Sequence, residues 1–168
     1  MLTKTTISAM RVLIYLGQNG EGGSQSPVKI ANDLGESPTY LAKVTGLLVK
    51  AGILRSERGA KGGVRLNRQP EEITFQAIME ACQGTIVGNF CLSTEDVDSV
   101  CAFHLAGLEL HQAILQTLSK WNLGHLLQKP RPSHPLKGNV PCVLGLIDPG
   151  EKAAPPFYQI TLTKPGAD

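Results

Sequence analysis

Hydroxyl and basic side chains recur between residues 37 and 65, at spacings that suit contact with a polyanion. Hydroxyl groups and an ammonium group lie near the start of a predicted helix, and more cations flank a glycine-rich segment at residues 59–63. Such groups contact the phosphates and base edges of DNA. The candidate DNA-contacting residues are Ser37, Thr39, Tyr40, Lys43, Arg55, Arg58, Lys61 and Arg65.

Four cysteines form the second set of chemically capable side chains: Cys82, Cys91, Cys101 and Cys142. In a reducing compartment, thiols serve as metal ligands, redox groups or small core residues more often than as disulfides. Cys82 follows an apolar helical stripe and is predicted to be a core residue. Cys142 lies among prolines and is predicted to be a small apolar residue or a solvent-exposed thiol.

Composition limits the class of protein that can carry these groups. A chain of 168 residues with 42% apolar and 18% charged residues can bury a core without disulfides. The sequence has no apolar run of about 18 residues and no signal-peptide core, so a cytoplasmic protein without membrane segments is expected.

Charge is distributed unevenly along the chain. Residues 1–68 carry ten Lys or Arg against four Asp or Glu, a net charge of +6. Residues 69–128 carry one against seven and residues 129–168 five against three, net charges of −6 and +2. The basic first segment favours a polyanionic partner.

The order of predicted elements in residues 1–84 is typical of a winged helix-turn-helix. Apolar spacing predicts a helix from Thr3 to Gly17, and Ser-Pro pairs at residues 26–27 and 37–38 start two short helices. Residues 53–58 and 64–67 are predicted strands of a hairpin with a glycine-rich tip. Thr74 then begins a helix that stops at Gly84. We therefore predict a mainly α fold with a small β-hairpin, in which residues 1–84 bind double-stranded DNA.

A longer helix is predicted from Ser99 to about Trp121, with apolar side chains on two sides. One stripe contains Phe103, Leu110, Ile114 and Trp121, and the other Cys101, Leu105, Leu108 and Leu115. A single small domain cannot cover both stripes, so this helix is predicted to form a homodimer through Leu105, Leu108 and Leu115. Residues 85–128 form this second unit, and residues 129–168 are a proline-rich tail.

Several segments occur in the order found in one family of bacterial regulators. They are Leu2-Thr3-Lys4, Ser37-Pro38-Thr39-Tyr40-Leu41, Ala51-Gly52-Ile53-Leu54, Arg58-Gly59-Ala60-Lys61-Gly62-Gly63-Val64-Arg65-Leu66 and Pro70-Glu71-Glu72-Ile73-Thr74. Over residues 2–127 the chain resembles the Rrf2 family of transcriptional regulators. The resemblance implies a homodimeric DNA-binding protein, and many members sense iron-sulfur status, nitric oxide, redox state or cysteine metabolism.

The resemblance also implies a candidate cofactor site. Many members hold an iron-sulfur cluster with three cysteines before the dimerisation helix, whereas this chain has Cys91, Cys101 and His104 there. These three could hold most of a [2Fe-2S] cluster, because His can replace Cys on one iron. Some relatives add a carboxylate from the first helix or the recognition helix, but Ile7 and Ala42 occupy those positions here. The alternatives are a reversible thiol switch at Cys91 and Cys101, or a site without a sensing role.

Enzyme motifs for nucleophilic, phosphate-binding or zinc chemistry are absent from the sequence, so a non-enzymatic protein is expected. The alternative to DNA binding is a winged-helix module for protein interactions. The +6 charge of residues 1–68 argues against that alternative.

Overall fold

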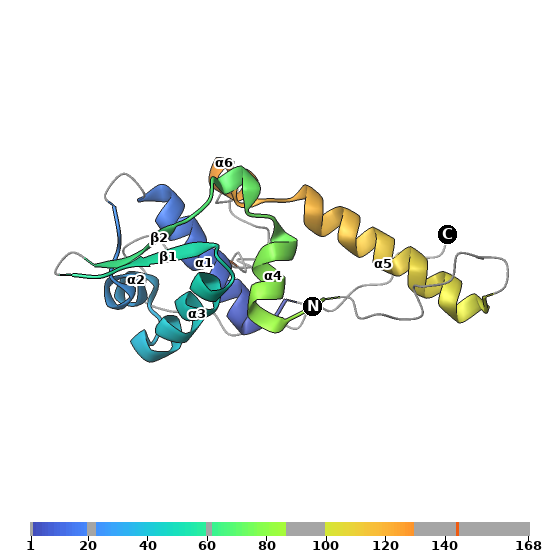
Figure 1. Cartoon of the computed structure of the whole chain (residues 1–168), viewed down its shortest axis with the longest axis horizontal. Helices are drawn as coiled ribbons and strands as arrows, with labels where there is room; N and C mark the ends of the chain where they lie inside the picture. The colour runs from blue at the N-terminus through green and yellow to red at the C-terminus, as the bar shows by residue number, and fades with distance from the viewer. Residues whose placement is uncertain (1, 20–22, 60–61, 87–99, 130–143, 145–168) are drawn as a thin grey trace, which may run out of the picture.

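The computed structural model describes residues 2–19, 23–59, 62–86, 100–129 and 144. Helices α1 and α2 are followed by α3, the β1–β2 hairpin, a short 3-10 helix η2 and three further helices (Figure 1). The bounds are α1 Lys4–Gln18, α2 Pro27–Leu34, α3 Pro38–Lys50, β1 Leu54–Glu57, β2 Gly63–Leu66, η2 Pro70–Glu72, α4 Phe75–Gln83, α5 Ala102–Lys120 and α6 Leu123–Gln128. The predicted mainly helical fold with one hairpin is confirmed.

Helix α1 lies at the centre of the core. Its residues Ala9, Val12, Leu13 and Ile14 are fully buried, because the other elements of the domain pack around it. Helix α3 contributes the fully buried Leu41, Val44 and Leu48. This leaves the opposite face of α3 in solvent, which is the arrangement that a recognition helix needs.

A buried ion pair fixes α1 against the turn between α2 and α3. The Arg11 guanidinium donates to Glu36 Oε1 at 2.7 Å, and both side chains are only 10% exposed. A second Arg11 nitrogen donates to the Leu34 carbonyl oxygen at 2.8 Å, and the Ser8 hydroxyl donates to Glu36 Oε1 at 3.0 Å. These contacts set the position of α3 relative to the core.

Tyr15 makes a second link between α1 and α2. Its hydroxyl donates to Asp33 Oδ2 at 2.5 Å. Burial, followed by the hydrogen bond and the negative charge of Asp33, raises the pKa of Tyr15 to about 12. The phenol therefore remains a neutral donor across the physiological pH range.

The hairpin pairs in antiparallel register, with Arg55 opposite Arg65 and Glu57 opposite Gly63. The segment before α2 adds a third backbone partner, because Gln25 and Val64 exchange two hydrogen bonds of 2.9 Å. A Cβ atom at Gly63 would collide with the Gln25 carbonyl group. The glycine at this position thus allows the α1–α2 connection to lie directly against the β1–β2 hairpin, which is the wing of the winged helix-turn-helix.

Helix α5 extends away from the domain like an arm, and only its C-terminal end is packed against α4 (Figure 1). Leu118 is buried there, and the Phe75 amide donates to the Trp121 carbonyl oxygen at 2.9 Å. The helix begins at Ala102, with Cys101 as N-cap, and so starts three residues later than predicted. None of the helices in the described part of the chain is long and apolar enough to cross a membrane.

Helix α6 returns the chain to the first domain. Leu123 is fully buried in the core, and Gly17 of α1 lies so close to Leu127 that a Cβ at residue 17 would come within 2.7 Å of it. Sequence reasoning did not predict this helix and grouped its residues with the dimerisation unit. Leu144 of the predicted tail also packs against the core.

Candidate nucleic-acid interface

The N-terminal half of α3 presents polar groups to solvent. Ser37, Thr39 and Lys43 are exposed, as predicted for residues that contact DNA. Ser37 occupies the N-cap position and Pro38 the first helical position. Because Leu41 and Val44 point into the core, Thr39 and Lys43 are held on the outer face of the helix. Whether these side chains contact DNA stays a prediction.

Tyr40 is different from its neighbours on α3. It is half-buried and packs against the core, and its hydroxyl donates to Thr5 Oγ1 at 3.4 Å. The Lys4 ammonium lies 5.3 Å from the centre of its ring, within range of a cation–π contact. Tyr40 therefore joins α3 to the start of α1, in addition to lying beside the exposed face.

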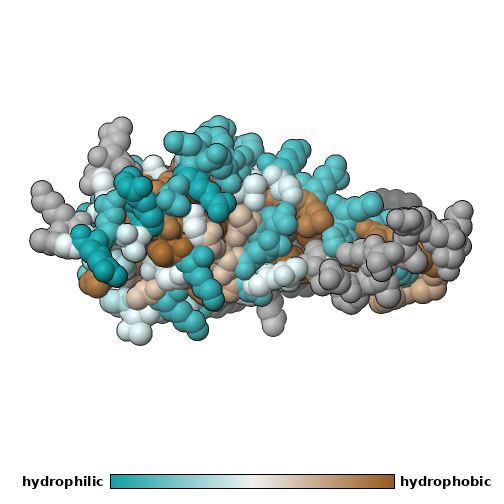
Figure 2. Space-filling model, viewed as in Figure 1, coloured by the Kyte–Doolittle hydropathy of each residue, from teal (hydrophilic) through white to brown (hydrophobic). Residues whose placement is uncertain are grey.

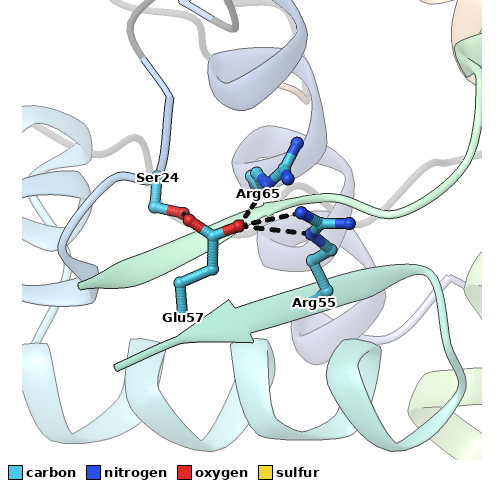
Figure 3. Close-up of polar contacts among 4 residues, drawn as sticks. All are labelled: Ser24, Arg55, Glu57 and Arg65. Carbon is cyan, nitrogen blue, oxygen red and sulfur yellow. Dashed lines mark hydrogen bonds and ion pairs between the residues drawn. The ribbon is translucent and has the colours of Figure 1, made fainter. Parts of the chain in front are cut away.

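The cations of the wing differ in whether their side chains form ion pairs. Arg58 is exposed, and no hydrogen bond or ion pair of its side chain is found within the described residues. Arg55 and Arg65 instead both bind the carboxylate of Glu57 (Figure 3). Lys61, the fourth predicted cation of the wing, lies outside the described residues.

Arg68 connects the base of the wing to the end of α3. Its guanidinium donates to the carbonyl oxygens of Ala51 and Gly52 at 3.3 and 3.2 Å, and Asn67 donates to Gly52 at 3.0 Å. Cations are favourable at a helix C-terminus, where carbonyl groups lack helical partners. Sequence reasoning missed this role of Arg68, although a basic residue just after the second strand was the available signal.

Helix α5 and its C-cap Trp121 expose four large apolar side chains. The exposed fractions are 82% for Phe103, 63% for Leu110, 46% for Trp121 and 37% for Leu105. Figure 2 shows hydrophobic atoms along this arm. Leu108 and Leu115 of the predicted interface are half-buried. The most exposed positions thus belong to the stripe of Phe103, Leu110 and Trp121.

The candidate cofactor ligands are only partly visible. Cys101 is exposed at the N-cap of α5, and His104 is half-buried one turn later. Cys91 lies outside the described residues, and within residues 100–129 and the other described ranges no three His, Cys, Asp or Glu side chains are grouped to bind a metal. Ile7 and Ala42 offer no ligand atoms in their side chains. Two donors are present, so the fit of a cluster depends on Cys91.

Cys82 is separate from these donors. It is half-buried against the core, and its thiol donates to the Thr5 carbonyl oxygen at 3.9 Å. Burial raises the pKa of the Cys82 thiol, which a hydrogen bond to Thr6 partly offsets. The predicted packing role of Cys82 agrees with this position, and a protonated thiol is a poor redox nucleophile.

Comparison with known proteins identifies the class defined by this fold. The profile of the Rrf2 family, described as "Iron-dependent Transcriptional regulator", matches residues 2–129. The chain is 31% identical over 152 residues to Protein aau3 of Rhizobium meliloti, covering 88% of this chain and 94% of that protein. It is also 31% identical to the regulator NsrR of Geobacillus kaustophilus, covering 76% and 89% of the two chains.

The chain is also similar to the solved structure of a transcriptional regulator. A putative transcriptional regulator from Listeria innocua is 30% identical and superposes with a TM-score of 0.65, covering 82% of this chain and 93% of that one. The chain therefore belongs to the Rrf2 family and is a transcriptional regulator with a DNA-binding winged helix-turn-helix.

Proposed function

We propose that this regulator acts in the cytoplasm as a homodimer, with α3 in the major groove of double-stranded DNA and the wing on the adjacent phosphates. The observation that carries this mode of binding is the two-sided character of α3. Leu41, Val44 and Leu48 are fully buried, whereas Thr39 and Lys43 face solvent. A short hydroxyl side chain and an ammonium at this end of a recognition helix suit base edges and phosphates.

The wing supplies the second contact of the proposed interface. Arg58 is exposed and adjoins the glycine-rich tip, where the Gly62 amide donates to the Gly59 carbonyl oxygen at 2.9 Å. This hydrogen bond holds Gly59 and Gly62 close together. A guanidinium beside such a turn can reach a phosphate or the minor groove, and Lys61 adds a second cation in the same segment.

Single substitutions should separate specific from electrostatic contacts. The probe is a labelled duplex that the wild-type protein selects from a random-sequence pool. Arg58→Ala should weaken binding and reduce the slope of log affinity against log salt by about one unit per protomer, because one phosphate contact is lost. Thr39→Ala should weaken binding to the selected duplex by about 0.5–1.5 kcal/mol, the usual contribution of one hydrogen bond, while leaving binding to a scrambled duplex nearly unchanged. Fluorescence anisotropy measures both quantities.

Lys120→Ala is the matched control, since it removes an exposed cation from α5 rather than from the wing. Unchanged salt dependence in Arg58→Ala would show that Arg58 does not contact a DNA phosphate, and an unchanged salt dependence in Arg58→Ala/Lys61→Ala would show that the wing does not contact DNA. Absence of salt-dependent DNA binding by the wild-type protein would support the protein-interaction module instead.

The dimer in this proposal forms through α5. Its arm carries three apolar side chains, Phe103, Leu105 and Leu110, that the domain leaves exposed. A twofold axis beside this helix would pair two recognition helices, as two DNA half-sites require. Leu108 and Leu115 lie half-buried next to this surface and remain predicted members of the interface.

A cofactor or redox site at the far end of α5 is the second part of the proposal. The supporting observation is an exposed Cys101 one helical turn before His104. With Cys91 these residues would supply three of the four ligands of a [2Fe-2S] cluster, which supplies redox-active iron when bound. A thiol switch between Cys91 and Cys101 is the alternative that uses the same cysteines.

Anaerobic purification distinguishes these possibilities. We expect visible absorption and bound iron and sulfide in the wild-type protein, and loss of both in Cys91→Ala and Cys101→Ala. Cys82→Ala is the control, because that thiol packs against the core and should not affect iron content. Absence of iron together with affinity changes on thiol oxidation would favour the thiol switch. Absence of both effects would show that the site has no sensing role.

A further inference from the structure

Glu57 is an acidic residue in the middle of a surface expected to bind a polyanion. Residues 55, 57 and 65 share one face of the hairpin, because Arg55 and Arg65 are directly opposite and side chains alternate along a strand. The other face carries Leu54 and Val64, which are 1% and 5% exposed in the core. Glu57 is therefore on the outer face of the wing, among the cations predicted to meet DNA.

One oxygen of Glu57 binds both arginines. Arg65 Nε donates to Glu57 Oε1 at 2.6 Å, and Arg55 donates to the same oxygen through Nη2 at 3.0 Å and Nε at 3.3 Å (Figure 3). Opposed cations on neighbouring strands repel each other. The carboxylate relieves this repulsion and reduces the net charge of the three groups to +1.

The second oxygen of Glu57 is held from the other side. Ser24, in the connection before α2, donates its hydroxyl to Oε2 at 2.6 Å (Figure 3). The neighbouring Gln25 is bonded to Val64 of the wing, so the position of Ser24 is fixed by backbone contacts. The carboxylate is thus oriented by three side chains from three separate segments.

We propose that Glu57 is a specificity-determining residue that occupies the place of a DNA phosphate between Arg55 and Arg65. Two guanidinium groups and a hydroxyl around a carboxylate are the same donors that would surround a phosphate. The side chains of Arg55, Glu57 and Arg65 are 40–49% exposed, so DNA can compete for the cations. Glu57 therefore limits binding to arbitrary DNA, which depends mainly on free cations.

Glu57→Gln tests this role, which rests on the proposed DNA-binding function. The amide keeps an acceptor for Ser24 but removes the charge that holds both arginines. Binding to a scrambled duplex of about 30 base pairs, roughly three helical turns, should tighten by roughly fivefold to tenfold. The salt dependence should steepen by about two units per protomer, because two cations become available for phosphates. Affinity for the duplex that the wild-type protein selects should rise less, so the ratio of the two affinities should fall.

Two comparisons make the outcome specific. Glu109→Gln removes the same charge from the exposed surface of α5 and should produce neither the affinity change nor the steeper salt dependence. In an Arg55→Ala/Arg65→Ala background, Glu57→Gln should have little effect, because no cations remain to be released. Matching thermal unfolding of Glu57→Gln and the wild-type protein checks that the hairpin stays folded.

Two results would overturn this role. One is a Glu57→Gln protein with the same salt dependence as Glu109→Gln. The other is a Glu57→Gln substitution that tightens DNA binding as much in the Arg55→Ala/Arg65→Ala background as in the wild-type protein. Either result would leave wild-type DNA binding intact. Failure of the wild-type protein to bind any duplex would instead contradict the proposed function itself.

Discussion

Arg11→Ala should destabilise the protein by about 3–5 kcal/mol, because it leaves the Glu36 carboxylate buried without its cation. Glu36 is 10% exposed, and Arg11 and Ser8 both bind its Oε1 atom. The same substitution removes the bond to the Leu34 carbonyl, which helps to fix the turn before α3. Urea unfolding followed by circular dichroism measures the loss, and DNA affinity should fall with it.

Tyr15→Phe is the matched control for this prediction. It also removes a link between α1 and α2, but the bond to Asp33 is exposed and should contribute only about 0.5–1.5 kcal/mol. Replacing both charged residues, as Arg11→Met with Glu36→Leu, should cost less than Arg11→Ala alone. Equal losses in Arg11→Ala and Tyr15→Phe would show that the buried pair does not hold the turn.

Substitution of Phe103 and Leu110 by Glu should convert the proposed dimer into monomers. These side chains are 82% and 63% exposed in one chain, so burying each against a partner stabilises association by about 1.5–3 kcal/mol. In a symmetric dimer each substitution is present in both chains, so the loss of association free energy is doubled, and the interface would contain four added carboxylates. Light scattering should give the mass of one chain, and affinity for the selected duplex should fall by at least about a hundredfold.

Gln116→Glu is the control for added charge, because it lies on an exposed polar face of the same helix. It should leave both the mass and the DNA affinity unchanged. Because the side chains of Phe103 and Leu110 are mostly exposed, their replacement should not alter thermal unfolding of the domain. A wild-type protein with the mass of one chain at micromolar concentration would contradict dimerisation through α5.

Local signals explain why most of the domain could be predicted from the sequence. The Ser-Pro pairs mark the starts of α2 and α3, and the apolar spacing of Leu41, Val44 and Leu48 identifies the buried face. The glycine-rich tip between two short strands identifies the hairpin. These features depend on residues within a few positions of each other, which is where sequence patterns are informative.

Contacts between distant segments could not be predicted in this way. The hydrogen bond between Ser24 and Glu57 and the bridge between Gln25 and Val64 join residues more than 30 positions apart. The end of α5 and the start of α6 depend on pairing of Thr74 with Asn122. Asn122 and His125 then cap α6 reciprocally, and the sequence offers no strong signal for a helix of six residues.

Dependence on distant contacts also explains why, in the described part of the chain, some of the predicted wing cations form ion pairs and another does not. Arg55, Arg58 and Arg65 are equivalent in the sequence, as basic residues beside a glycine-rich turn. Only the strand register places Arg55 opposite Arg65 and brings Glu57 to both. On α3, tertiary packing likewise places Tyr40 against Thr5 while Thr39 and Lys43 stay exposed.

A hydroxyl-radical footprint on the selected duplex tests most directly that α3 and the wing of two chains bind DNA together. The account predicts two protected regions related by twofold symmetry, with centres about one helical turn or a multiple of it apart. Arg58→Ala should weaken the protection contributed by the wing and keep that of α3. A single protected region, or two regions that Thr39→Ala, Lys43→Ala and Arg58→Ala all leave unchanged, would contradict it.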